Sequence, residues 1–427
     1  MNSSFILKGD ICYSKDLHSL HTQADGYAVC VEGISAGVYE TLPPAYAHLP
    51  LLDYSGMLIL PGLTDLHMHA PQYAFRALGM DLELLDWLNT HAFPEEAKYK
   101  DPAYAEKAYG PLMQALVKGP NTRICLFSTL HTPATILLMD MLEASGLVSM
   151  VGKVNMDRNS PPDLCEESAA KAYADTRAWL VSTLGAYRRV KPILTPRFIP
   201  SCSDALMEGL AELRREFQLP LQSHLSENPS EIQWVQSLCP KSAGYADAYR
   251  QYGLFEGESP VIMAHCVWSQ EDEIALLRNH RVFVAHCPQS NENLASGIAP
   301  IRRFLTAGVS VGLGSDVAGG CHSSIFRAMA DAIQVSKLRW RLVDEASPPL
   351  TLAEAFYLGT IGGGSAFGQV GSLAPGYAFD ALIMEDASLE APFSLSIEDR
   401  LARVVYLAED RHIVQKFVEG AALFPQP

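Results

Sequence analysis

Short apolar runs alternate with longer periodic segments through most of the chain. A short apolar run bounded by turn residues is typical of a buried strand, and apolar positions three or four apart are typical of an amphipathic helix. The runs that predict strands are 57–66, 122–130, 148–154, 192–197, 220–224, 261–265, 282–286 and 309–314. The segments that predict helices between them include 103–117, 164–189, 205–217, 271–279 and 298–307.

This repeated order of strand and helix predicts parallel strand pairing, and eight repeats favour a closed (β/α)8, TIM-like barrel. An open, doubly wound α/β sheet would show the same alternation. The barrel is favoured because polar residues that could perform chemistry follow several strands, from the first strand to the last. The 427 residues also exceed the roughly 250 of a single barrel, which leaves room for a second domain.

The two ends of the chain have a different pattern, of short strands and turns. Neither end is large enough to bury a core alone, so we expect them to meet in one small domain. The sequence therefore predicts a composite β domain, of β-sandwich type, from residues 1–60 and 373–427. Residues 61–372 would form the barrel.

Composition excludes several classes of function. The net charge is −16 and no block of Lys and Arg occurs, so nucleic acid is not expected as a partner. The first ten residues do not resemble a signal peptide and no run of about 18 apolar residues follows, which predicts a cytoplasmic protein that does not bind a membrane. Nine scattered cysteines without a Cys-x-x-Cys pair predict reduced thiols rather than disulfides or a zinc ribbon.

His67 and His69 lie two positions apart at the first predicted barrel strand. Side chains at i and i+2 of a strand point to the same face and can bind one metal ion. Alone, the pair is equally well explained by two hydrogen-bonded histidines. The metal interpretation gains support because His224, His265 and Asp316 each follow an apolar run as well.

Three of these histidines and the aspartate match a catalytic metal site. Such sites use nitrogen and oxygen ligands and keep one position open to water. His67, His69, His224 and Asp316 would leave a net charge of +1 around Zn²⁺, which would lower the pKa of a bound water. We predict one Zn²⁺ per chain, and Fe²⁺ accepts the same ligands.

Glu227 follows His224 by three residues, where the chain leaves its strand. A carboxylate there could reach both a metal-bound water and a substrate nitrogen. The alternative is a helix-capping role together with Ser226 or Asn228.

Two further histidines end predicted strands. His265 could orient a hydroxide or polarise the substrate, or it could be a buried, hydrogen-bonded histidine. His286 fits a substrate contact and an indirect supporting role equally well. The glycine-rich turn around Asp316 lacks the Lys of a phosphate loop, which argues against nucleotide phosphate binding.

Several short sequence motifs occur one after another along the chain. They are His-Ala-Pro-Gln-Tyr at 69–73, Thr-Pro-Arg-Phe at 195–198, Gln-Ser-His-Leu-Ser-Glu-Asn at 222–228, His-Cys-Pro-Gln-Ser-Asn at 286–291 and Gly-Ser-Asp-Val-Ala-Gly-Gly at 314–320. Over residues 56–385 the chain resembles the mononuclear deaminase branch of the amidohydrolase superfamily, and more narrowly the guanine deaminase family. It departs from the family pattern at Leu66, Cys266, Val267 and Ser315, none of which is a predicted metal ligand.

The resemblance implies hydrolysis of guanine to xanthine and ammonia, in purine catabolism, by a homodimer. Lys191 lies at the wrong end of its strand to bridge two metals, which favours a single ion. The resemblance also implies that Arg197 binds the carbonyl edge of the purine, that Gln72 binds an edge with donor and acceptor, and that Phe198 stacks on the ring. For Arg197 the alternative is a surface salt bridge, and for Trp87 core packing is as good an interpretation as substrate stacking.

The mechanism that the resemblance implies uses the same residues. Glu227 or Asp316 takes a proton from the metal-activated water, and the resulting hydroxide attacks the amino-bearing carbon. Glu227 then protonates the ring nitrogen and the leaving amine, while His265 stabilises the developing oxyanion. In this arrangement the substrate is also expected to contact His69, His224, Glu227 and Asp316.

Two alternatives remain open at this point. The same site could deaminate another aminated heterocycle, such as 8-oxoguanine, a pterin or a triazine. The chain could also be a binding protein without enzymatic activity, although such a protein would be expected to have lost some of the predicted ligands.

Overall fold

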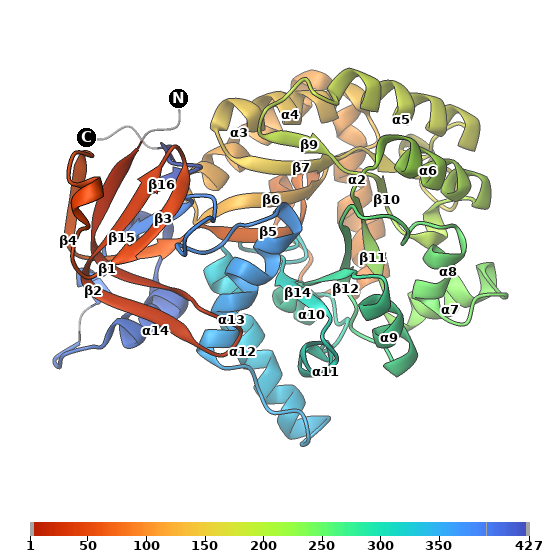
Figure 1. Cartoon of the computed structure of the whole chain (residues 1–427). Helices are drawn as coiled ribbons and strands as arrows, with labels where there is room; N and C mark the ends of the chain where they lie inside the picture. Colours follow the sequence, from red (N-terminus) through yellow and green to blue (C-terminus); the bar gives the residue numbers. More distant parts are fainter. Residues whose placement is uncertain (1–3, 390, 424–427) are drawn as a thin grey trace.

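The computed structural model describes residues 4–389 and 391–423, and it contains parallel strands surrounded by helices beside a separate sheet formed by both ends of the chain (Figure 1). The parallel strands form two four-stranded sheets, β5-β6-β7-β9 and β11-β12-β13-β14, and a short pair, β8-β10. Their bounds are β5 (Leu63–His69), β6 (Asn121–Phe127), β7 (Val148–Gly152), β8 (Val154–Asn155), β9 (Val190–Pro192), β10 (Thr195–Pro196), β11 (Leu221–Leu225), β12 (Val261–His265), β13 (Phe283–His286) and β14 (Ser310–Leu313).

Backbone hydrogen bonds connect the two four-stranded sheets at both seams. At one seam Leu194 N donates to Pro220 O at 3.0 Å, and Gln222 N donates to Leu194 O at 2.9 Å. At the other seam, Asp316 N donates to His67 O at 2.8 Å and His69 N donates to Val317 O at 3.0 Å. Side chains from both sheets also share one buried cluster, which contains Leu66, Cys125, Met150, Ile193, Ile262, Ala264, Ala285 and Ala366.

Helices cover the outside of these strands and are close to the predicted segments (Figure 1). The predicted helix 164–189 is shorter in the structure because Ser168 caps its start, accepting a hydrogen bond from Lys171 N. Among the described residues, no helix is both long and apolar enough to cross a membrane. The helices are α1 (Leu84–Trp87), α2 (Phe93–Glu96), α3 (Pro102–Lys118), α4 (Thr132–Ser145), α5 (Ala169–Thr183), α6 (Asp204–Phe217), α7 (Pro229–Leu238), α8 (Tyr245–Gln251), α9 (Glu271–Asn279), α10 (Pro288–Asn293), α11 (Ile301–Ala307), α12 (Ile325–Leu342), α13 (Leu352–Tyr357) and α14 (Ile397–Leu407).

The two ends of the chain form one seven-stranded mixed sheet, in the order β17-β16-β15-β4-β1-β2-β3. All neighbours in it are antiparallel except β1 and β4, which are parallel. The predicted β-sandwich is not confirmed, because these strands belong to a single sheet. They are β1 (Phe5–Ser14), β2 (Leu20–Val31), β3 (Ile34–Tyr39), β4 (Leu51–Pro61), β15 (Ala381–Met384), β16 (Ile413–Val418) and β17 (Ala421–Ala422).

This sheet is attached to the parallel strands by buried charges. Arg123 on β6 donates from Nε to Asp380 Oδ2 at 2.7 Å and from NH2 to Asp380 Oδ1 at 3.1 Å. Lys416 on β16 donates from Nζ to the carbonyl oxygens of Leu116, Gly119 and Asn121. The C-terminal strands are therefore held against α3 and β6 by hydrogen bonds that are closed to solvent.

Three predicted strands each cover parts of two strands in the structure, and one of them, 148–154, runs from β7 into the start of β8. The predicted first strand, 57–66, contains parts of two strands: residues 57–61 belong to β4 in the terminal sheet, and β5 begins at Leu63. The chain changes sheets at Gly62, where a Cβ would lie 2.4 Å from the Thr122 side chain. The fourth predicted strand is divided into β9 and β10, which pair with different neighbours, β9 with β7 and β10 with β8.

Candidate active site

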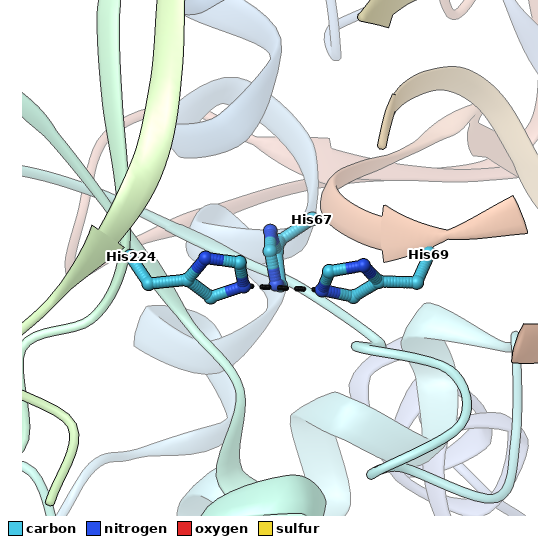
Figure 2. A group of neighbouring side chains, drawn as sticks. All are labelled: His67, His69 and His224. Carbon is cyan, nitrogen blue, oxygen red and sulfur yellow. Dashed lines mark hydrogen bonds between the residues drawn. The ribbon is translucent and has the colours of Figure 1, made fainter. Parts of the chain in front are cut away.

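Histidines from different strands meet at the C-terminal ends of the parallel strands. Figure 2 shows the rings of His67 and His69, from β5, converging with that of His224, from β11, and the Nε2 atoms of His69 and His224 are 3.1 Å apart. The possible ligand atoms of these three histidines all lie within 4.8 Å of one another. The same is true of His67, His265 and Asp316. The structure thus brings together every residue that was predicted to bind the metal.

One hydrogen bond of His224 indicates which of its ring nitrogens could bind a metal ion. Nδ1 lies 2.6 Å from Arg197 O, and since a carbonyl only accepts, Nδ1 carries the proton and Nε2 has a lone pair. Burial lowers the pKa of both His224 and His69 well below the usual value, so both rings are neutral. Two neutral imidazoles with converging nitrogens, one fixed through a backbone carbonyl, fit a divalent metal ion.

Asp316 supplies the negative charge of the cluster. Its Oδ1 lies 3.1 Å from His67 Nε2 and 3.6 Å from His69 Nε2, and its Oδ2 lies 3.7 Å from His265 Nε2. Burial alone would raise the pKa of Asp316, but the surrounding histidines outweigh this effect and hold the pKa far below the usual range. The carboxylate is therefore ionised. His265 and Asp316 also adopt left-handed backbone conformations, with φ of 72° and 44°, which are uncommon for residues that carry a side chain.

Glu227 lies beside this cluster, with Oε2 3.5 Å from His265 Nε2. Burial raises the pKa of Glu227 to about 7, against the opposing effect of His265. Such a carboxyl group can both accept and donate a proton near neutral pH. The capping role considered for Glu227 belongs to other residues, since Asn228 caps α7 and Glu231 completes the capping box.

Two buried polar side chains hold Glu227 and His265 in place. Ser296 Oγ donates to Glu227 Oε1 at 3.2 Å. Asn291 Oδ1 lies 2.9 Å from His265 Nδ1, which directs His265 Nε2 towards Glu227 and Asp316. Burial alone would lower the pKa of His265, but the two carboxylates raise it above the usual value. Neither Ser296 nor Asn291 was predicted as a functional residue from the sequence.

A cavity opens beside these groups. It is lined by every residue that the predicted mechanism places in contact with the substrate, and by His265 as well. Apolar side chains from α1 and the π-helical turn η3 (Leu88–Ala92) close another side of it. The lining residues are His69, Gln72, Leu84, Leu85, Trp87, Leu88, Arg197, Phe198, His224, Glu227, Glu231, His265, Leu294 and Asp316.

Arg197 and Gln72 both bind the carboxylate of Glu96, a residue that the sequence did not indicate. Arg197 NH1 lies 2.5 Å from Glu96 Oε2, and Arg197 NH2 lies 3.0 Å from Oε1. Gln72 Nε2 donates to the same Oε1 at 2.7 Å. The surface salt bridge considered for Arg197 is wrong, because both partners are buried. The only sequence signal was an acidic pair, Glu95 and Glu96, in a segment that packs against the pocket.

Three aromatic residues have distinct positions. Phe198 lines the cavity, with its ring edge-on to Trp234 at a centroid distance of 6.2 Å. Trp87 also lines the cavity, but it is 2% exposed and donates from Nε1 to Leu78 O, so it serves in the core as well. His286 does not line this cavity, and it borders a separate one beneath α11 and α12. The substrate contact considered for His286 is not supported.

Comparison with known proteins agrees with this geometry. The family model described as "Amidohydrolase family" matches residues 58–423. A guanine deaminase of Dictyostelium discoideum is 37% identical over 87% of this chain and 83% of its own length, and one of Rattus norvegicus is 36% identical over 86% and 83%.

A solved structure gives the same result. The crystal structure of guanine deaminase from C. acetobutylicum with guanine bound in the active site has a TM-score of 0.96 and 44% identity, covering 99% of this chain and 100% of that one. These relatives match most or nearly all of the chain. The chain therefore belongs to the amidohydrolase family and, within it, to the guanine deaminases.

Proposed function

We propose that this protein hydrolyses guanine to xanthine and ammonia. The observation that carries the proposal is the composition of one pocket, in which Glu227, His69, His224 and Asp316 line the same cavity as Arg197 and Gln72. The relative from C. acetobutylicum, which has guanine bound in its active site, is 44% identical to this chain. Its bound purine supports the same class of substrate here.

The donor set fits one divalent metal ion. His67, His69, His224 and Asp316 would hold it, and we propose Zn²⁺, with Fe²⁺ as a chemically acceptable substitute. When bound, the ion would lower the pKa of a water molecule towards neutrality and so provide a nucleophile.

The protein's own residues move the protons. Glu227 accepts a proton from the attacking water at one carboxylate oxygen and delivers it to the ring nitrogen beside the amino-bearing carbon. Glu227 then takes the remaining proton of the former water, from the hydroxyl now on the ring carbon, and delivers it to the amine. The C–N bond breaks, ammonia leaves and the oxygen stays on the ring as a carbonyl. His265, whose Nε2 faces Glu227 and Asp316, stabilises the negative charge that develops on this oxygen.

Binding is assigned to the other side of the pocket. Arg197 donates to the ring carbonyl, Gln72 binds an edge with donor and acceptor, and Phe198 provides a stacking face. The apolar wall of α1 and η3 excludes water from the ring.

The test is a guanine turnover assay with purified, zinc-loaded protein, in which xanthine and ammonia are measured together. We expect both products in equal amounts, and neither with His69→Ala. Turnover of 8-oxoguanine, a pterin or a triazine in place of guanine would show that the substrate assignment is wrong. A metal-loaded protein that deaminates none of these rings would overturn the enzymatic proposal.

We further propose that residues 61–372 form one closed (β/α)8 barrel, with residues 1–60 and 373–427 as the second domain. The backbone hydrogen bonds at both seams support closure. A homodimeric state, a cytoplasmic location and a role in purine catabolism stay predictions, and light scattering of the purified protein measures the first.

A further inference from the structure

We propose that Glu96 is a positioning residue for purine recognition, which holds Arg197 and Gln72 in the single orientation that guanine requires. The inference rests on the proposed function. Glu96 is buried, 2% exposed, and does not line the cavity, whereas Arg197 and Gln72 both do. It would therefore act on the substrate only through these two side chains.

Both carboxylate oxygens of Glu96 are occupied by the recognition residues. Oε2 accepts from Arg197 NH1, and Oε1 accepts from both Arg197 NH2 and Gln72 Nε2. One carboxylate thus connects two residues that are 125 positions apart in the chain. A charged acceptor with two-pronged geometry fixes a guanidinium more strongly than a neutral group does.

The amide of Gln72 is fixed at both ends. Ala318 N donates to Gln72 Oε1 at 3.2 Å, and Glu96 accepts from Gln72 Nε2. A backbone N–H cannot accept and a carboxylate cannot donate, so turning the amide over would lose both bonds. The remaining N–H of Gln72 therefore has a defined direction. Ala318 lies two residues after Asp316, which connects this contact to the catalytic side.

Arg197 is held by two side chains of one short helix, α2. Phe93 and Glu96 lie three residues apart on α2, and the Arg197 guanidinium carbon lies 5.1 Å from the centroid of the Phe93 ring. The Glu96 carboxylate accepts hydrogen bonds from both terminal nitrogens of the guanidinium, and the Phe93 ring lies over the face of the guanidinium. The N–H groups that remain can only donate, so the substrate edge opposite Arg197 must offer acceptors, such as a ring carbonyl or an unprotonated ring nitrogen.

Replacing Glu96 by a neutral residue tests the positioning role separately from catalysis. With Glu96→Gln the buried guanidinium loses its charged partner, and the two recognition side chains can adopt other orientations. The groups around Glu227 and the metal ligands remain intact. We expect a change in binding with little change in the chemical step.

Glu95→Gln is the matched control. Glu95 is the neighbouring buried carboxylate, but it binds Lys98 and Tyr104, which do not line the cavity. Both variants remove one negative charge from the same helix. A general effect of lost charge on α2 would appear in both, and a recognition effect only in Glu96→Gln.

The experiment measures guanine kinetics, inhibition by hypoxanthine and metal content for both variants and the wild type. Hypoxanthine keeps the ring carbonyl but has no amino group to lose, so its inhibition constant reports binding alone. For Glu96→Gln we expect KM and the inhibition constant to rise together by about tenfold, with kcat within about threefold of wild type and metal content unchanged. Glu95→Gln should match the wild type in all of these.

A Glu96→Gln protein with wild-type KM and hypoxanthine inhibition would overturn the inference, as would a loss confined to kcat or to metal content. Wild-type protein that leaves guanine unchanged would instead overturn the proposed function. Should Glu96→Gln not fold, Glu96→Asp keeps the charge and withdraws the carboxylate by about 1.5 Å. We expect the same KM-selective loss in that variant, and wild-type KM would reject the positioning role.

Discussion

The pocket has a catalytic side and a recognition side, and they are built differently. The catalytic side carries His67, His69, His224 and His265 at the ends of parallel strands, where ladder hydrogen bonds fix the backbone. The recognition side depends on α1, η3 and α2, which are helical pieces of four or five residues with different hydrogen-bonding patterns. The histidines of the catalytic side are thus placed on regular strands, whereas the recognition side depends on an irregular helical segment.

This difference predicts a separation of kinetic effects. Changes on the catalytic side should reduce kcat or metal binding, because those residues meet the reacting atoms. Changes on the recognition side should raise KM. The following variants test the separation, in order of decreasing effect.

The largest effect should come from the metal ligands. His69→Ala removes a nitrogen that lies 3.1 Å from His224 Nε2, so we expect metal content to fall well below one ion per chain and kcat to fall by roughly 10⁴-fold or more. Mass spectrometry of bound metal and guanine turnover measure both. His286→Gln is the control, because His286 lies outside the cavity, and a similar loss of metal in it would refute the assignment.

Glu227→Gln should be the next most severe change. The amide cannot take the proton from water, and we expect kcat to fall by about 10³-fold while KM and bound metal stay near wild type. Turnover within tenfold of wild type would show that another group carries the proton.

Asn291→Ala tests how His265 is held. Without the acceptor on Nδ1, the imidazole can adopt the other tautomer or rotate, and we expect kcat to fall by about 10- to 100-fold with unchanged KM. A rise in KM alone would place His265 on the recognition side.

In metal-free protein, Glu227 should lower the stability of the fold at neutral and higher pH, although turnover requires it. Its pKa is raised by burial from 4.5 to about 7, so between these pH values the folded state binds more protons than the unfolded state, and stability falls as pH rises. Glu227→Gln has no such loss. We expect this variant to be more stable than the wild type by about 3 kcal/mol at pH 8, and nearly equally stable near pH 4.5. Urea unfolding at the two pH values measures the difference, and a gain that is constant with pH would contradict the explanation.

The smallest effect should come from Phe93→Leu, on the recognition side. The substitution removes an aromatic face from the Arg197 guanidinium but keeps the Glu96 carboxylate, so we expect KM to rise about threefold with unchanged kcat. A drop in kcat of the same size would show that the two sides are not separable.

The same contrast determines what could be predicted from the sequence. Period-two spacing places His67 and His69 on one face, and the apolar runs before His224, His265 and Asp316 place these residues at strand ends. Parallel strands present their C-terminal ends on one side, so these local patterns were sufficient to assemble the cluster.

The recognition side could not be derived in this way. Arg197 and Gln72 were proposed through the family resemblance, and no periodic pattern marks Glu96, because its role depends on contacts with Arg197, which follows β10, and with Gln72, in the turn after β5. Ser296 and Asn291 were missed for the same reason. The strand boundary at Gly62 was also missed, because an apolar run continues through the point at which the chain moves from one sheet to the other.

The terminal sheet has a consequence for the order of events during synthesis. Strand β4 pairs on one side with β1, which is made before it, and on the other with β15, which follows more than 300 residues later. While the ribosome is still making the barrel, the edge of β4 that β15 will cover has no partner, and an open strand edge is a site of aggregation. A chain that ends before β15 therefore keeps this edge of β4 exposed, and a chain that includes β15 can cover it.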